Sequence, residues 1–155
     1  MNHDTDKLRD DAIGIWQAGV DAVRSEQLVT QYVALRGDQL CIGDDVVSLN
    51  RVRRIVVVGA GKAGAGMAEG LEAALGKDVM LEKGVQGLIN VPADCYRPTE
   101  RIILHPARPA GINEPTREGV SGAEKMLHMV RSLGPEDLCI CLLSGGASAL
   151  LPAPI

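Results

Sequence analysis

Phenylalanine is absent from this sequence of 155 residues, and aromatic residues make up only 2% of it. The interior must therefore be built from Val, Leu, Ile, Ala and Met. A basic excess is also missing, since the formal net charge is −4. Without a basic stripe to neutralise phosphates, and with few rings to stack on bases, the chain is not expected to bind nucleic acid.

The sequence also lacks a recognisable signal peptide or membrane span. Its start, MNHDTDKLRDD, is polar and rich in acid, whereas a secretory signal needs a basic start followed by an apolar stretch. No apolar run approaches the length that crosses a bilayer. We therefore expect a cytoplasmic protein with no membrane partner.

The four cysteines form no CxxC pair, and their spacing with the three histidines matches no zinc pattern, so no metal ligand is predicted. Cys139 and Cys141 lie two apart in an apolar run, and on a strand they would share one face as small buried hydrophobes. Cys95 could be a reactive thiol in a loop, although no neighbour in the sequence favours an activated nucleophile.

Apolar residues recur at helical spacing near the start of the chain. They predict helix over residues 5–36, with Ser25 available to cap a second segment. One buried stripe is expected from Leu8, Ala12, Ile15, Gly19 or Val20, and Val23. Two short apolar runs flank Gly43, and they predict a small hairpin or extended link within residues 38–49. We therefore expect a helical segment, residues 1–36, ahead of the main sheet.

Strands and helices alternate from Ile55 onward. Strands are predicted over 55–58, 85–91, 101–104 and 138–143, and helices over 62–75, ending near Gly76, and over 115–133. This alternation predicts an α/β fold, with a mostly parallel, Rossmann-like sheet, right-handed crossovers and helices on both faces. The length suits one such domain.

A glycine-rich turn follows the first of these strands. Gly59, Gly61 and Gly64 have the GxGxxG spacing of a dinucleotide site. A Rossmann site also needs an acidic residue at the end of the second strand to hold the ribose, and the nearer acids, Asp78 and Glu82, precede that strand. An NAD site therefore loses its main support.

Lys62 lies inside this turn, where a helix begins. Free backbone N–H groups, glycines that admit an anion and a nearby ammonium group suit a phosphate or a carboxylate. The loop is no Walker A motif, because GxxxxGK followed by Ser or Thr is missing. A tight turn that carries a solvated lysine is the alternative.

A second glycine loop, Ser144 to Ser148, follows the last apolar strand. Its hydroxyls and backbone N–H groups could form a nest for an oxyanion. Both loops should lie at the carboxyl edge of one parallel sheet and face a common crevice. His105 also follows a predicted strand end; it could contact substrate or carry a proton, and a structural hydrogen-bonding role is the slightly favoured alternative.

The ordered segments VVVGAGKAGAGMAEGL, LHP and DLCICLLSGGASALLPAPI resemble the amino-terminal domain of the class II glycerate kinases. The carboxyl-terminal part of that family is called the MOFRL domain, and many members are labelled hydroxypyruvate reductase. The resemblance implies ATP-dependent phosphorylation of D-glycerate, usually at the 2-hydroxyl, with Mg²⁺, in a cleft between two α/β domains. It makes Lys62 the active-site lysine and Ser144, Gly145, Gly146 and Ser148 the serine and glycine loop.

Two departures from the family pattern stand out. Members commonly read HPxPD after the third strand, whereas this sequence reads HPARPAGINEP. Family chains also continue well beyond the position of Ile155. The resemblance therefore predicts that residues 1–155 form a single, incomplete domain without the MOFRL domain, which supplies one wall of the cleft and shows little or no turnover alone.

Two other functions stay open. One is an NAD(P)H-dependent hydroxypyruvate reductase, which would need the ribose-binding acid. The other is a non-catalytic fragment that binds an anion, or that forms a homodimer through exposed apolar surface. For the kinase, the predicted catalytic residue is Lys62, and the predicted substrate- and phosphate-binding residues are Gly59, Gly61, Ser144, Gly145, Gly146, Ser148 and His105.

Overall fold

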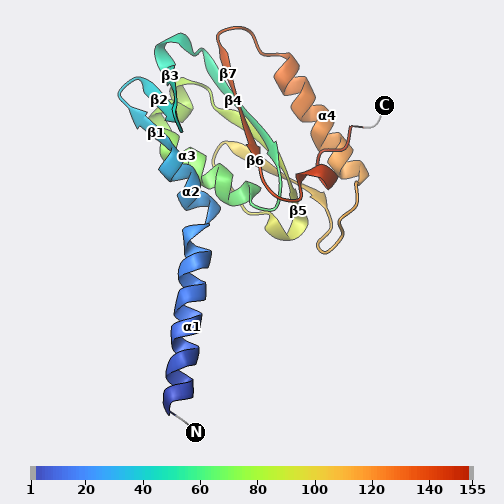
Figure 1. Ribbon diagram of the computed structural model, residues 1–155. Coiled ribbons are helices and arrows are strands. Elements are labelled where there is room, and N and C mark those ends of the chain that lie inside the picture. Colours follow the sequence, from blue (N-terminus) through green and yellow to red (C-terminus); the bar gives the residue numbers. More distant parts are fainter. Residues whose placement is uncertain (1–2, 154–155) are drawn as a thin grey trace.

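A four-stranded parallel sheet forms the centre of the computed structural model, which describes residues 3–153 (Figure 1). Its strands, in the spatial order β6-β5-β4-β7, are β4 (Arg54–Ala60), β5 (Gln86–Pro92), β6 (Ile102–Arg108) and β7 (Asp137–Leu143). Helices α3 (Gly64–Glu82) and α4 (Arg117–Arg131) form the crossovers from β4 to β5 and from β6 to β7. The predicted α/β class, the parallel sheet and the two helices are confirmed.

Strand β4 is buried on both faces. Ile55 and Val57 belong to the main core, which includes the α3 side chains Ala68, Leu71 and Leu75. Val56 and Val58 point the other way and pack with Met126 of α4. Because neighbouring residues of a strand face opposite sides, this division places α3 and α4 on opposite faces of the sheet.

The amino-terminal segment holds two helices, the second of which begins at Ser25, and then a strand. It contains α1 (His3–Ala22), α2 (Ser25–Tyr32) and β1 (Val33–Arg36), followed by β2 (Gln39–Ile42) and β3 (Asp45–Ser48). The prediction of helix up to residue 36 is wrong because β1 pairs antiparallel with β2 and buries the β-branched Val33. The predicted hairpin is confirmed as β2 and β3, which together with β1 form a three-stranded sheet.

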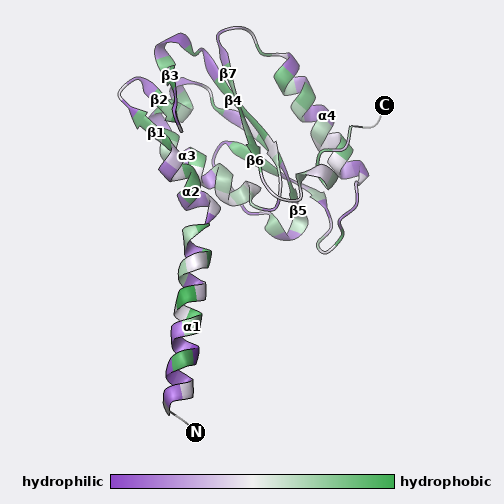
Figure 2. Ribbon diagram, in the orientation of Figure 1, coloured by the Kyte–Doolittle hydropathy of each residue, from purple (hydrophilic) through white to green (hydrophobic). Residues whose placement is uncertain are grey.

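The predicted buried stripe of the first helix is wrong as well. Helix α1 projects away from the rest of the molecule (Figure 1), and apolar residues recur along it (Figure 2). Leu8 is 67% exposed, Ile15 77% and Val23 67%. The predicted helix is present, but no other element within residues 3–153 faces the stripe and buries it.

Only one face of strand β7 is buried against other elements. Cys139, Cys141 and Leu143 are exposed, while Ile140 and Leu142 between them are buried. The prediction that the two cysteines are buried is wrong because α4 lies over β4, β5 and β6 and leaves one face of the edge strand β7 open.

The amino ends of β4 and β7 are held together by a charged cluster. Arg53 donates two hydrogen bonds to the Asp137 carboxylate, at 2.9 and 2.8 Å, and Arg54 donates a third at 3.1 Å. These bonds, led by those of Arg53 and helped by the N–H of Gly134, lower the pKa of Asp137. The cluster fixes the register of the two strands whose other ends carry the glycine loops.

Helix α3 passes through a break at Gly76, where φ is 69°. The prediction that a helix ends near Gly76 is confirmed for the first stretch, because the Gly76 backbone is non-helical, and a second, short helical stretch then continues to Glu82. Before the break, Glu72 is 7% exposed and accepts hydrogen bonds from the backbone N–H groups of Glu100, Arg101 and Ile102, at 2.9, 2.7 and 2.8 Å. The carboxylate thereby fixes the start of β6.

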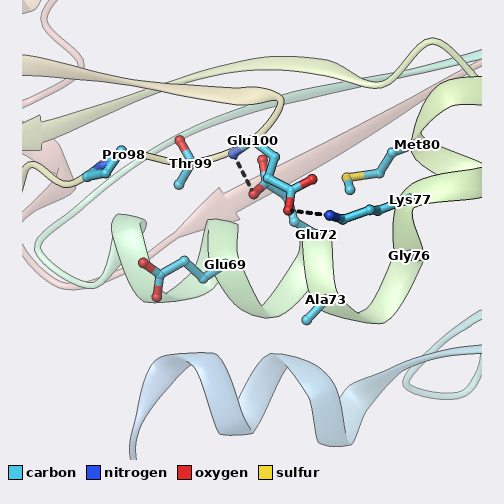
Figure 3. A pocket seen from close by; sticks show the side chains of 9 residues that line it. All are labelled: Glu69, Glu72, Ala73, Gly76, Lys77, Met80, Pro98, Thr99 and Glu100. Atoms are coloured by element: carbon cyan, nitrogen blue, oxygen red, sulfur yellow. Dashed lines mark hydrogen bonds and ion pairs between the residues drawn. The ribbon is translucent and has the colours of Figure 1, made fainter.

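Glu72 lines a hollow of about 590 Å³ (Figure 3). The other carboxylates there are also engaged, Glu69 with Arg97 at 2.6 Å and Glu100 with Lys77 at 3.8 Å. The carboxylates that line this hollow, over the middle of α3, are therefore accounted for by structural contacts.

The variant Glu72→Ala should lose about 3 kcal/mol of the free energy of unfolding, because it leaves three backbone donors without their charged acceptor. Glu69→Ala is the matched control on the same helix. Since the Glu69 ion pair is largely exposed, we expect a change of no more than about 1 kcal/mol there. Urea denaturation of both variants measures the difference, and equal losses would contradict the role of Glu72.

No helix within residues 3–153 is long and apolar enough to cross a membrane.

Candidate functional site

The two glycine loops leave the sheet side by side. Strands β4 and β7 are parallel neighbours, and their last residues, Ala60 and Leu143, are partners in the register. The turn after β4, residues 61–63, and the loop after β7, residues 144–148, therefore start at the same edge of the sheet. The predicted juxtaposition of these loops is confirmed.

Three hydrogen bonds join the second loop to the end of β4 and to the turn that follows it. The Ser144 N–H donates to the Ala60 carbonyl at 3.1 Å, and the Lys62 N–H donates to the Gly145 carbonyl at 3.2 Å. The Ala63 N–H donates to the Ser144 hydroxyl oxygen at 3.0 Å. Since Ala63 has no capping side chain of its own, Ser144 replaces the missing cap at the amino end of α3.

Gly59 and Gly61 allow β7 and its loop to come this close. A Cβ atom at Gly59 would overlap the carbonyl oxygen of Leu142, and one at Gly61 would overlap the hydroxyl of Ser144. Gly61 also has a φ of 137°, which disfavours any other residue. Close packing alone accounts for both glycines, and their contact with a phosphate stays a prediction.

Lys62 lies against the second loop. A Cβ atom on Gly146 would be 3.5 Å from the Lys62 Cε, so the alkyl part of the lysine runs beside this glycine. The Lys62 side chain as a whole is exposed. Among residues 3–153, the N–H groups of Gly145 and Gly146 donate to no carbonyl oxygen, which leaves both donors for an anion.

Two small hollows open on either side of this contact. The first, about 340 Å³, is lined by Asn113, Pro115, Gly146, Ser148 and Ala149. The second, about 280 Å³, is lined by Lys62, Pro92, Asp94, Cys95, Arg108, Gly111 and Asn113. We call them the serine hollow and the arginine hollow. Asn113 lines both hollows, and the contacting residues Lys62 and Gly146 line one each.

Arg108 is a site residue that the sequence analysis missed. It is 4% exposed and ends β6, which the sequence pattern had predicted to end at residue 104. The strand is longer because its pairing with β5 continues through a register shift near Pro92. A basic residue within HPARP, where members of the resembled family carry HPxPD, was the only signal available in the sequence.

His105 is level with the last residues of β4 and β7 in the sheet register, but its side chain contacts α4. It lies inside β6, and its Nε2 is 2.9 Å from the Glu118 carbonyl oxygen of α4. Its predicted position after a strand end is therefore wrong, because β6 continues for three more residues, to Arg108. The contact with α4 agrees with the structural alternative.

Cys95 lines the arginine hollow but is not activated. Partial burial, together with the negative charge of Asp94, raises the pKa of its thiol, and the nearby Lys62 and Arg108 offset only part of this effect. A raised pKa lowers the thiolate population that a nucleophile needs.

A family model described as a domain of unknown function, DUF4147, matches residues 11–155. The chain belongs to the DUF4147 family. Human glycerate kinase is 32% identical over 161 residues, which cover 96% of this chain and 29% of the human protein. A putative hydroxypyruvate reductase from Agrobacterium vitis is 41% identical over 102 residues, 65% of this chain and 21% of that protein.

Among solved structures, the DUF4147 chain is similar to the glycerate kinase of Thermotoga maritima, with a TM-score of 0.69 and 23% identity over 97% of this chain and 31% of the other. This similarity shows the fold. The resemblance to the amino-terminal domain of the class II glycerate kinases is confirmed by these matches. The chain spans less than a third of the length of the glycerate kinases that it matches.

Proposed function

We propose that this chain supplies one wall of an active site that phosphorylates D-glycerate with ATP to give 2-phosphoglycerate. The observation that carries the proposal is the pairing of the Lys62 turn with the Ser144 loop at the carboxyl edge of a parallel sheet. Ligands of open α/β sheets bind at this edge. The names of the human and Thermotoga relatives point to the substrate.

Phosphoryl transfer requires positioned anions and offset charge more than it requires covalent chemistry by the protein. In the proposed site, the Lys62 ammonium group neutralises negative charge, and the N–H groups of Gly145 and Gly146 donate to phosphate oxygens. The Ser144 hydroxyl holds the two loops in place. ATP supplies the phosphoryl group when it is bound.

Magnesium is not assigned to residues of this chain. Residues 3–153 contain no group of three or more His, Cys, Asp or Glu side chains that could hold a metal ion. A magnesium ion that is bound chiefly through substrate phosphates does not need such a group.

A hydroxypyruvate reductase is the competing function, because one relative carries that name. Binding distinguishes the two, since a ligand that binds only the folded chain raises its melting temperature. We expect the melting temperature to rise with magnesium and ATP and with D-glycerate, and to stay constant with NADH. A rise with NADH alone would favour the reductase.

The chain of 155 residues should show little or no kinase turnover by itself, because the proposed groups form only one wall of the site. The measurement is ADP formation that depends on both ATP and D-glycerate, at saturating concentrations of each. Robust turnover by this chain would show that one wall is sufficient and would overturn that part of the proposal.

A further inference from the structure

We infer that Arg108 and Lys62 together bind the carboxylate group of the acceptor substrate in the arginine hollow, while the serine hollow receives phosphate. This inference rests on the proposed function and assigns a ligand group to each side of the Lys62 contact. The sequence motifs assign no ligand to either loop, and they give no role to Arg108.

Arg108 carries a buried charge without a partner. The residue is 4% exposed, and its Nε is buried without a hydrogen-bond acceptor. Among residues 3–153, no carboxylate forms an ion pair with its guanidinium group, although Asp94 lines the same hollow. Burial of an unpaired cation lowers the stability of a fold, so a ligand that supplies the missing anion would restore part of that stability.

The volume of the arginine hollow and the residues that line it restrict the size and charge of the ligand. Its volume of about 280 Å³ lies just below the range of pockets that hold drug-sized molecules, so a small acid fits better than a nucleotide. The planar guanidinium fork pairs with a carboxylate through two parallel hydrogen bonds. Lys62 lines the same hollow and adds a second positive charge.

The position of Lys62 links the two hollows. Its methylene groups lie beside Gly146, which lines the serine hollow, while the residue itself lines the arginine hollow. A three-carbon acid held at Arg108 would therefore extend its hydroxyl groups toward Lys62 and the free N–H groups of the second loop. In this arrangement the acceptor hydroxyl and the phosphate meet at Lys62.

Titration calorimetry of the 155-residue chain with D-glycerate tests this assignment. We expect Arg108→Met to weaken D-glycerate binding at least about tenfold, because a charged hydrogen-bonded contact is lost. Affinity for magnesium-bound ATP should change by less than about threefold. Arg108→Lys, which keeps the charge but loses the fork, should bind D-glycerate with intermediate affinity.

The stability of Arg108→Met without ligand is the second readout. Removal of an unpaired buried cation should raise the melting temperature, whereas a merely structural arginine would lower it when replaced. Arg101→Met, near the start of β6, is the control; Arg101 is exposed, so its replacement should leave both affinities unchanged.

Titrations with D-lactate, glycerol and inorganic phosphate distinguish a wrong assignment of Arg108 from a wrong proposed function. We expect no binding of glycerol, which lacks the carboxylate. Unchanged D-glycerate affinity in Arg108→Met would overturn the assignment and leave the proposed function intact, and so would an Arg108-dependent site that prefers inorganic phosphate. If D-lactate and D-glycerate bind equally well through Arg108, the carboxylate site stands and the glycerate kinase proposal loses its support. Failure of the unsubstituted chain to bind D-glycerate or D-lactate would overturn both.

Discussion

Replacement of Lys62 with methionine should weaken the binding of both magnesium-bound ATP and D-glycerate by about 10- to 100-fold. Methionine keeps much of the alkyl chain that lies beside Gly146 and removes only the ammonium group. Since Lys62 lines the arginine hollow and contacts the second loop, the loss should extend to both ligands. This distinguishes it from Arg108→Met, which should affect D-glycerate alone.

Lys77→Met is the matched control, because Lys77 lies on α3 with an exposed side chain and pairs only loosely with Glu100, at 3.8 Å. Titration calorimetry of both variants with each ligand makes the comparison. Unchanged affinities in Lys62→Met would exclude the ammonium group from the site. A similar loss in Lys77→Met would mean that the effect reflects net charge and not position.

Alanine at Gly59 should lower the free energy of unfolding by about 3 kcal/mol. The new Cβ would overlap a backbone oxygen, that of Leu142, which cannot rotate away as a side chain can. Strands β4 and β7 would have to separate. Because the two glycine loops continue from these strands, the separation should also disturb the contact between Lys62 and Ser144.

Gly145→Ala is the control within the same site. No heavy atom lies within 4 Å of a Cβ built there, and the residue does not have a positive φ. We expect its free energy of unfolding to stay within about 0.5 kcal/mol of the original, as for most surface substitutions. Urea denaturation compares the variants. If Gly59→Ala were as stable as Gly145→Ala, close strand packing would not explain this glycine.

The sequence was sufficient for the central sheet. Strand β4 has a continuous β-branched run that is covered on both faces, and alternation with helices then determines a parallel arrangement. Strand β1 was missed because helical periodicity continues through α2 into Val33, and only pairing with β2 decides its conformation. The exposed stripe of α1 shows the same limit, since a pattern predicts an apolar face but not what covers it.

The residues of the candidate site likewise include some that the sequence predicts and one that it does not. The Lys62 turn and the Ser144 loop could be found because each follows an apolar strand in a parallel sheet, and this topology brings their ends together. Arg108 could not be found because its importance depends on burial and on the absence of a partner, both of which are tertiary properties. Its position became visible only when β6 proved to extend past His105.

Backbone amide chemical shifts of the 155-residue chain, recorded by NMR during titration with magnesium-bound ATP and then D-glycerate, test most directly whether the two loops form one site. For each ligand, we expect the amide signals of Lys62, Ala63, Gly145 and Gly146 to shift together. Their shifts should reach saturation at the same concentration of that ligand. Shifts confined to the hollow beside Glu72, or loops that respond at different concentrations, would contradict a shared anion site.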